Sequence, residues 1–211
     1  MIIINSVVVW IIISMSINTY LMTLPIPVIR KKDFPTTYMI QHQNQIDFQN
    51  GTECAAFSTA YLLRHFGMDA EGEALYKHFP NKTTAGNVYP KGIRTVLRNY
   101  GFKTNYYKGS INTLKSEVSK GNPVIVFIKV QKDLKNLHFV PVVGYDREYI
   151  YLSESLSHLV NDEGEQKNYN RKVPIEEFKL LWDVKRIHML PYSNTYIAVK
   201  LNKANKSISS R

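Results

Sequence analysis

Cys54 and His138 are the residues whose types and spacing could carry out nucleophilic chemistry. Cys54 lies in the first turn of a predicted helix, where unpaired backbone N–H groups and the helix dipole favour the thiolate, the nucleophilic form of cysteine. His138 lies in the apolar run LHFVPVVGY, where an imidazole needs a hydrogen-bond partner. Either residue alone is also compatible with an ordinary core position. Together, a cysteine at a helix start and a later histidine on a strand are typical of a thiolate–imidazolium pair.

A catalytic imidazole also needs a third group that holds its second nitrogen. Glu154 is the first candidate, because it follows the strand predicted to form a hairpin with the His138 strand. Asp146 is the rival, but it lies in the hairpin turn, where an aspartate commonly has a structural role. Ser153 is a weaker third candidate.

Acyl chemistry further needs N–H donors at the point where negative charge develops on the substrate oxygen. The backbone N–H of Cys54 is one such donor. A side-chain amide shortly upstream is the expected second donor, and Gln49 is the nearest glutamine. Because this segment contains several glutamines, Gln45 could serve instead.

The elements that must position these groups form two blocks, with helices first and strands second. Polar residues 33–50 predict a loop leading into the first helix, which Thr52 caps and Gly67 ends. The apolar patterns predict further helices at 70–79, 90–100, 110–118 and 174–182, and strands at 123–130, 137–145, 148–152 and 194–201. This order predicts an α+β fold in which N-terminal helices pack on an antiparallel β-sheet.

Composition restricts the class of protein further. An apolar fraction of 44% is sufficient for a packed core, and 211 residues suit one globular domain, predicted at 33–201. The single cysteine excludes an internal disulfide and a zinc site of several cysteines, and the histidines show no close pair at metal-ligand spacing, so no metal is expected. Basic residues give a net charge of +10 but are scattered, so no nucleic-acid partner is expected, although charge alone would also suit a basic nucleic-acid- or membrane-binding protein.

The two ends of the chain differ from this domain. Residues 1–32 open with an apolar stretch to Pro25 that is about long enough for a membrane helix, and Arg30, Lys31 and Lys32 follow it. This pattern predicts membrane association through residues 1–25 with the domain on the cytoplasmic side. The alternatives are a cleaved signal, or a mis-assigned start with Met22 as the first residue of a cytoplasmic protein. Residues 202–211 are predicted to be a flexible basic tail.

Four segments resemble the papain-like cysteine peptidases that process bacteriocin leader peptides at double-glycine sites, the C39-like family, and its stand-alone members. They are QNGTECAAFSTAYLLRHFG around Cys54, YPKGIRTVLRNYGF at 89–102, GNPVIVFIKV at 121–130 and LHFVPVVGYDREYIYLSES at 137–155.

The resemblance implies a papain-like fold, hydrolysis of a peptide or related amide through a thioester, a peptide substrate and no cofactor. It implies Cys54 as nucleophile, His138 as general base, Gln49 near the oxyanion, and Glu154 where the family places an Asp or Asn.

This sequence departs from the family pattern in three places. Ala55 and Ala56 follow the cysteine where the family often has Gly-Pro, Gln49 is one residue closer to the cysteine than is usual, and Glu154 is longer than the family's residue. An amidase or acyltransferase that uses the same Cys-His pair therefore remains an alternative, as does a non-catalytic peptide-binding module on the same fold.

Overall fold

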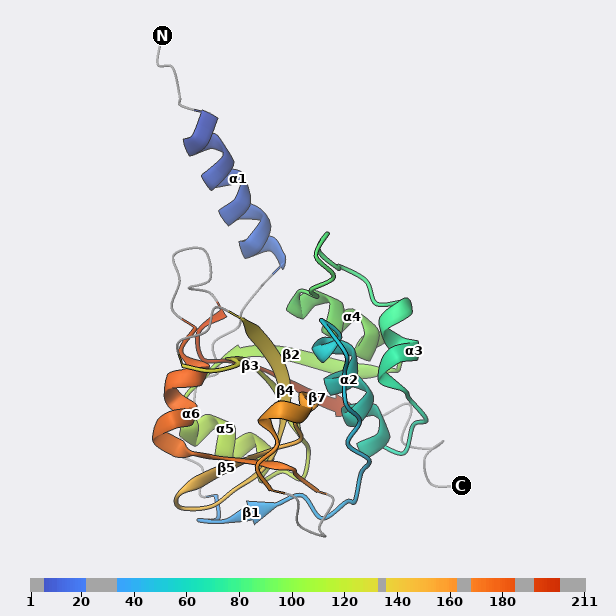
Figure 1. The fold of residues 1–211 in the computed structure, drawn as a ribbon, viewed down its shortest axis with the longest axis vertical. Coiled ribbons are helices and arrows are strands. Elements are labelled where there is room, and N and C mark those ends of the chain that lie inside the picture. Colours follow the sequence, from blue (N-terminus) through green and yellow to red (C-terminus); the bar gives the residue numbers. More distant parts are fainter. Residues whose placement is uncertain (1–5, 22–33, 133–135, 163–167, 185–191, 202–211) are drawn as a thin grey trace.

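The computed structural model of the chain describes residues 6–21, 34–132, 136–162, 168–184 and 192–201 (Figure 1). The helices in these residues are α1 (Ser6–Leu21), α2 (Cys54–His65), α3 (Gly72–Lys77), α4 (Pro90–Asn99), α5 (Ile111–Val118), α6 (Ile175–Trp182) and the short 3-10 helix η1 (Ser157–Leu159). The strands are β1 (Tyr38–Met39), β2 (Phe102–Lys108), β3 (Val124–Lys129), β4 (Leu137–Tyr145), β5 (Tyr149–Leu152), β6 (Arg171–Pro174) and β7 (Thr195–Leu201). The predicted α+β class is confirmed.

The described strands form one antiparallel sheet in the order β2-β7-β3-β4-β5-β6, with β1 paired to the end of β4. In the centre, β3 and β4 pair along their lengths, and Ile128 lies opposite His138. Strand β5 pairs with β4 only from Val142 onward. Beyond β5 the chain remains beside β4, because the N–H of Ser153 donates to the carbonyl of Pro141 (3.0 Å). This course brings the residue after Ser153 toward His138.

Helices cover the sheet from two sides, with α2, α3 and α4 on one side and α5 and α6 on the other (Figure 1). Alternate side chains of β3 pack into the two hydrophobic cores that lie on the two faces of the sheet. Ile125 packs with the cluster that contains α2 and α4, whereas Val124, Val126 and Ile128 pack with the cluster that contains α5 and α6. Burial on both faces explains why β3 is an almost continuous apolar run.

The predicted cap of helix α2, Thr52, is wrong, because the helix begins at Cys54 and the residue before it is Glu53. Glu53 is the N-cap residue and makes no side-chain cap hydrogen bond. The Glu53 carboxylate instead accepts from the N–H of Gly51 (2.7 Å), which forms a tight turn ahead of the helix, and the Thr52 hydroxyl lies 3.2 Å from the Tyr76 hydroxyl. Cys54 is therefore the first residue of α2, as close to the helix N-terminus as a helical residue can be.

The predicted end of α2 at Gly67 is confirmed. Gly67 has φ +76°, and its N–H donates to Arg64 O while the N–H of Met68 donates to Leu63 O. This pair of hydrogen bonds is the Schellman motif, which needs a left-handed residue and so favours glycine.

Three strands were not predicted from the sequence, namely β1, β2 and β6. Strand β2 reads FKTNYYK, in which Lys103 and Lys108 are exposed and Thr104 is buried, and it is an edge strand paired only to β7. Strands β1 and β6 have two and four residues, too few for an alternating pattern to be recognised. These strands exist because long-range partners complete their hydrogen bonding.

The predicted properties of the chain ends are mostly untested by the structure. Residues 1–5, 22–33 and 202–211 lie outside the described residues, and these include Met22, the basic cluster and the predicted tail. The described side chains of α1 at positions 6–16 are exposed. No helix within the described ranges combines the length and the apolar character needed to cross a bilayer.

Helix α6 provides a test of the second core. Leu181 is 1% exposed and its neighbour Leu180 is 54% exposed. We expect Leu181→Ala to lower the free energy of unfolding by about 2–5 kcal/mol, because it removes buried methyl groups and leaves a cavity. The matched change Leu180→Ala should alter it by less than about 0.5 kcal/mol. Urea denaturation of the two variants measures both values, and equal losses would contradict the assigned packing of α6.

Candidate active site

A cleft of about 570 Å³ lies where the start of α2 meets the start of β4. Cys54 and His138 both line it, so the structure brings together the two residues that the sequence singled out. The wall beside them includes Gln49, Asn87 and Phe139. None of the described residues that line the cleft is a lysine, arginine, aspartate or glutamate, although the whole chain carries a net charge of +10.

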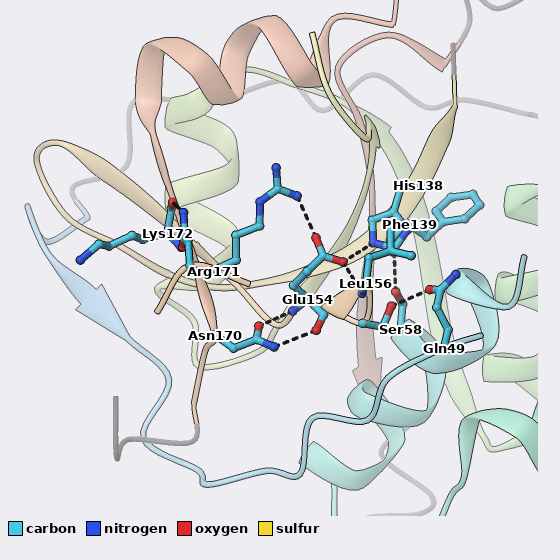
Figure 2. Close-up of polar contacts among 11 residues, drawn as sticks. Gln49, Ser58, His138, Phe139, Glu154, Leu156, Asn170, Arg171 and Lys172 are labelled. Atoms are coloured by element: carbon cyan, nitrogen blue, oxygen red, sulfur yellow. Dashed lines mark hydrogen bonds and ion pairs between the residues drawn. The ribbon is translucent and has the colours of Figure 1, made fainter. Parts of the chain in front are cut away.

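Helix α2 is fixed against β4 by a buried hydrogen bond. The Ser58 hydroxyl, one turn after Cys54, donates to the carbonyl of Phe139, the residue after His138 (2.9 Å; Figure 2). Ala55 and Ala56 are fully buried in the core cluster that also contains Phe139. The Ser58 hydrogen bond therefore holds the start of α2 beside the strand that carries the imidazole.

The imidazole of His138 contacts two groups in the interior. Its Nε2 lies 2.7 Å from Oε1 of Glu154, which leaves Nδ1 to interact with the Cys54 side chain. His138 is 1% exposed, and burial by itself would lower the pKa of its imidazole. The charge of Glu154 and the hydrogen bonds to Cys54 and Glu154 outweigh burial and raise the pKa of His138 to about 10.

Glu154 is fully buried, and each of its carboxylate oxygens has a partner. Oε1 accepts from His138 and from the N–H of Leu156 (2.9 Å), and Oε2 accepts from Arg171 (2.8 Å; Figure 2). Burial would raise the pKa of the Glu154 carboxyl, but the charge and hydrogen bond of His138, the charge of Arg171 and the Leu156 N–H lower it to about 2. The carboxylate is therefore ionised at neutral pH.

Asn170 and Arg171 support Glu154 and were not identified from the sequence. The side-chain amide of Asn170 donates to the Glu154 carbonyl (2.8 Å) and its oxygen accepts the Glu154 N–H (2.7 Å). Arg171 begins β6, where buried and exposed residues alternate. The sequence contains no signal for either contact, because β6 reaches Glu154 only through its pairing with β5.

Neither of the two other candidates for the third group makes a hydrogen bond or an ion pair with the His138 imidazole, whose carboxylate partner is Glu154. Asp146 accepts from the backbone N–H groups of Glu148 and Tyr149 and from the Tyr151 hydroxyl, so it stabilises the hairpin turn. The backbone of Ser153 is hydrogen-bonded to β4. Glu154 is the candidate that lies beside the imidazole.

Gln49 lies at the cleft, as the sequence predicted, whereas Gln45 does not. The Gln49 amide donates one N–H to Gly51 O (2.6 Å), and its oxygen accepts from the Ser155 hydroxyl (2.7 Å). An amide nitrogen carries two hydrogens, so one remains for a substrate oxygen. Gln45 is exposed and donates to Asp47 outside the cleft.

No group of three or more His, Cys, Asp or Glu side chains among the described residues is arranged to hold a metal ion. The absence of a required cofactor remains a prediction from the sequence.

The sequence matches the Peptidase_C39 like family over residues 36–186. No protein of curated function matches it. Among solved structures, the peptidase domain of Streptococcus ComA, a bi-functional ABC transporter involved in quorum sensing, is similar in fold with a TM-score of 0.58. The two chains are 16% identical, and the similarity covers 76% of this chain and all of that domain.

Two further structures are similar over most of their length. A C39-like peptidase from Bacillus anthracis has a TM-score of 0.57 at 18% identity, covering 78% of this chain and 98% of that one. A double glycine motif protease from an AMS/PCAT transporter, solved in complex with its leader peptide, has a TM-score of 0.51 at 17% identity, covering 78% and 98%. At these identities the comparisons show a shared fold, that of the papain-like cysteine peptidases.

The opposite pKa shifts of Glu154 and His138 predict how stability depends on pH. The contribution of Glu154, whose pKa is lowered from 4.5 to about 2, is complete above pH 4.5 and is lost as the pH falls toward 2. The contribution of His138, whose pKa is raised from 6.5 to about 10, is complete below pH 6.5 and is lost as the pH rises toward 10.

We therefore expect the difference in free energy of unfolding between wild type and Glu154→Gln to be largest between pH 4.5 and 6.5. Urea denaturation at a series of pH values measures this difference. Glu148→Gln, which changes an exposed glutamate, is the control and should show a small difference at every pH. A difference for Glu154→Gln that did not vary with pH would contradict the assigned charges.

Proposed function

The chain belongs to the C39-like peptidase family, and on that basis we propose that it is a cysteine peptidase that hydrolyses a peptide bond through a thioester on Cys54. The observation that carries this proposal is that Cys54 and His138 line the same cleft and interact, while the far nitrogen of the His138 imidazole is hydrogen-bonded to the buried Glu154. A nucleophile, a base and a group that orients the base are the parts that thiol catalysis requires.

In the first half of the proposed reaction, the Cys54 thiolate attacks the carbonyl carbon of the scissile bond. Negative charge moves to the carbonyl oxygen, where the N–H of Cys54 and the remaining N–H of Gln49 can donate to it. The carbon–nitrogen bond then breaks, and the leaving amine takes the proton from Nδ1 of His138. The product of this half is a thioester on Cys54.

In the second half, neutral His138 removes a proton from water, and the hydroxide attacks the thioester carbonyl. The thiolate leaves, the peptide acid departs, and His138 is again protonated. Glu154 keeps the imidazole in one orientation through both halves, because its hydrogen bond to Nε2 does not involve the reacting nitrogen.

The lining of the cleft favours a substrate whose segment nearest to Cys54 is an uncharged peptide. Apart from the proposed Cys54–His138 pair, the described lining contains no lysine, arginine, aspartate or glutamate, and the apolar lining includes Val88, Phe127, Val130 and Leu137. The similar double glycine motif protease binds a leader peptide. A peptide cleaved after Gly-Gly is therefore the first substrate to try.

Alkylation of Cys54 against pH tests the Cys54–His138 pair without a substrate. We expect iodoacetamide to modify Cys54 rapidly at pH 6, well below pH 8.5 where an isolated thiol ionises, because the imidazolium stabilises the thiolate. His138→Ala should lower the rate at pH 6 by about tenfold or more. His78→Ala, which removes an exposed histidine at the C-terminal end of α3, is the matched control and should leave the rate unchanged. Ordinary thiol behaviour in the wild type would favour the non-catalytic binding module.

Paired glutamine variants test the proposed oxyanion donor. For hydrolysis of a fluorogenic peptide cleaved after Gly-Gly, we expect Gln49→Ala to lower kcat about 10²-fold, the usual effect of losing one such donor. Gln45→Ala changes an exposed glutamine of the same segment and should leave kcat unchanged. Equal effects of the two variants would contradict the assigned role of Gln49.

The products distinguish the alternatives on the same fold. With the same peptide and an added primary amine, mass spectrometry shows a free acid if water is the acceptor and an amide if the protein is an acyltransferase. A peptide that ends in a Gly-Gly aldehyde should form a hemithioacetal on Cys54. Binding of the Gly-Gly peptide without either product or adduct would favour the binding module.

A further inference from the structure

The carboxylate of Glu154 lies between two cations (Figure 2). Oε1 is 2.7 Å from His138 Nε2, and Oε2 is 2.8 Å from a guanidinium nitrogen of Arg171. The side chain of Arg171 is 8% exposed, that of His138 is 2% exposed and that of Glu154 is fully buried. All three charges are therefore removed from water and compensate one another.

With the proposed thiolate, the cluster has charges of alternating sign that sum to zero. Cys54 is negative, His138 positive, Glu154 negative and Arg171 positive. A neutral sum matters here because an uncompensated buried charge is costly, and a buried site reduces that cost by binding or releasing a proton. Arg171 is the one member of the cluster that cannot lose its charge, since a guanidinium stays protonated in proteins.

We propose that Arg171 is a positioning residue for the reaction, and that it sets the pH range in which Cys54 and His138 exist as thiolate and imidazolium. This inference rests on the proposed function, because it takes Cys54 and His138 as the reacting pair. Arg171 acts on them through Glu154, whose carboxylate it holds in place and whose charge it balances.

The direction of the effect follows from the charge balance. Without Arg171, the cluster is left with an excess negative charge, so it retains a proton to a higher pH and the thiolate–imidazolium form is displaced toward alkaline pH. Without the Glu154 charge, the excess is positive, and the same form is displaced toward acid pH. When both charges are absent, the two displacements oppose each other.

Arg171 also accounts for the glutamate at position 154. The carboxylate must reach His138 with one oxygen and Arg171 with the other while its backbone is held by Asn170 on both sides. An aspartate is one methylene shorter, so from the same backbone position it could not make both contacts. A glutamate at position 154 is therefore needed for the carboxylate to contact both His138 and Arg171.

Other titratable groups near the cluster have their own partners or lie in solvent. Tyr61 of α2 donates its hydroxyl to Asn168 O, and burial, opposed by the charge of Arg64, raises its pKa, so it is neutral. His158 on η1 is exposed at the cleft. Charged residues on β6 and α6 form ion pairs at the surface, namely Lys172 with Asp162 and Lys179 with Glu176, while Glu177 is not fully buried.

The test uses four variants of the full chain. Arg171→Met and Glu154→Gln each remove one charge, and Glu154→Gln with Arg171→Met removes both. Lys172→Met removes a cation from the next residue of β6, whose side chain is exposed on the other face of the strand, and is the matched control. The measurements are the pH dependence of Cys54 alkylation by iodoacetamide and the titration of the His138 imidazole by ¹⁵N NMR.

The expected order of the His138 titration, from low to high pH, is Glu154→Gln, the double variant, the wild type and Arg171→Met. Arg171→Met should lie about one pH unit above the wild type, the usual effect of one nearby charge. The rise of the alkylation rate should move in the same direction, and Lys172→Met should coincide with the wild type. A residue that only supported the fold would change amplitude or stability without this order.

An Arg171→Met titration at or below the wild type would overturn the proposal, as would an equal shift in Lys172→Met. If Arg171→Met does not fold, the double variant with its balanced charges still provides the test, because a titration at or below that of Glu154→Gln alone would overturn the proposal. Neither measurement requires peptide hydrolysis. A wild type that hydrolyses no peptide while the order holds would therefore count against the proposed function alone.

Discussion

The Glu154 carboxylate has no contact with solvent and is nevertheless ionised. Such a group is stable in a protein interior only when opposite charges and hydrogen bonds replace its hydration, at a cost of several kcal/mol where they are missing. His138, Arg171 and the Leu156 N–H supply that replacement. The need to satisfy this one carboxylate holds together the end of β5, the start of β4 and the start of β6, three places that are distant in the sequence.

The position of helix α2 relative to His138 is set by a second constraint, the packing of the helix on β4. The Ser58 hydrogen bond to Phe139 and the buried Ala55 and Ala56 hold the helix close to the strand. Because Cys54 is the first residue of α2, its backbone N–H has no acceptor within the helix and can serve a substrate. The contact that holds α2 to the sheet therefore also fixes the distance between the proposed nucleophile and its base.

The departures from the family pattern have physical explanations in this chain. The two alanines after Cys54 are fully buried in the core cluster that contains α2 and part of the sheet. The longer Glu154 spans two cations instead of one. Gln49 lies at the cleft although it is one residue closer to the cysteine, because its backbone and side chain are both hydrogen-bonded to Ser155. None of these departures removes a group that the proposed chemistry needs.

The sequence alone determined the α+β class, the main helices and central strands, and the identity of the unusual cysteine and histidine. These are local properties, since helix periodicity, buried β-branched runs and a polar residue in an apolar strand can each be recognised within a few residues. Only the tertiary structure decided between Glu154 and Asp146 as the neighbour of His138, placed Gln49 rather than Gln45 at the cleft, and revealed Asn170 and Arg171. Those outcomes depend on strand register and on the pairing of β6 with β5, which no single segment encodes, because a hydrogen bond between distant residues forms only once the sheet has brought them together.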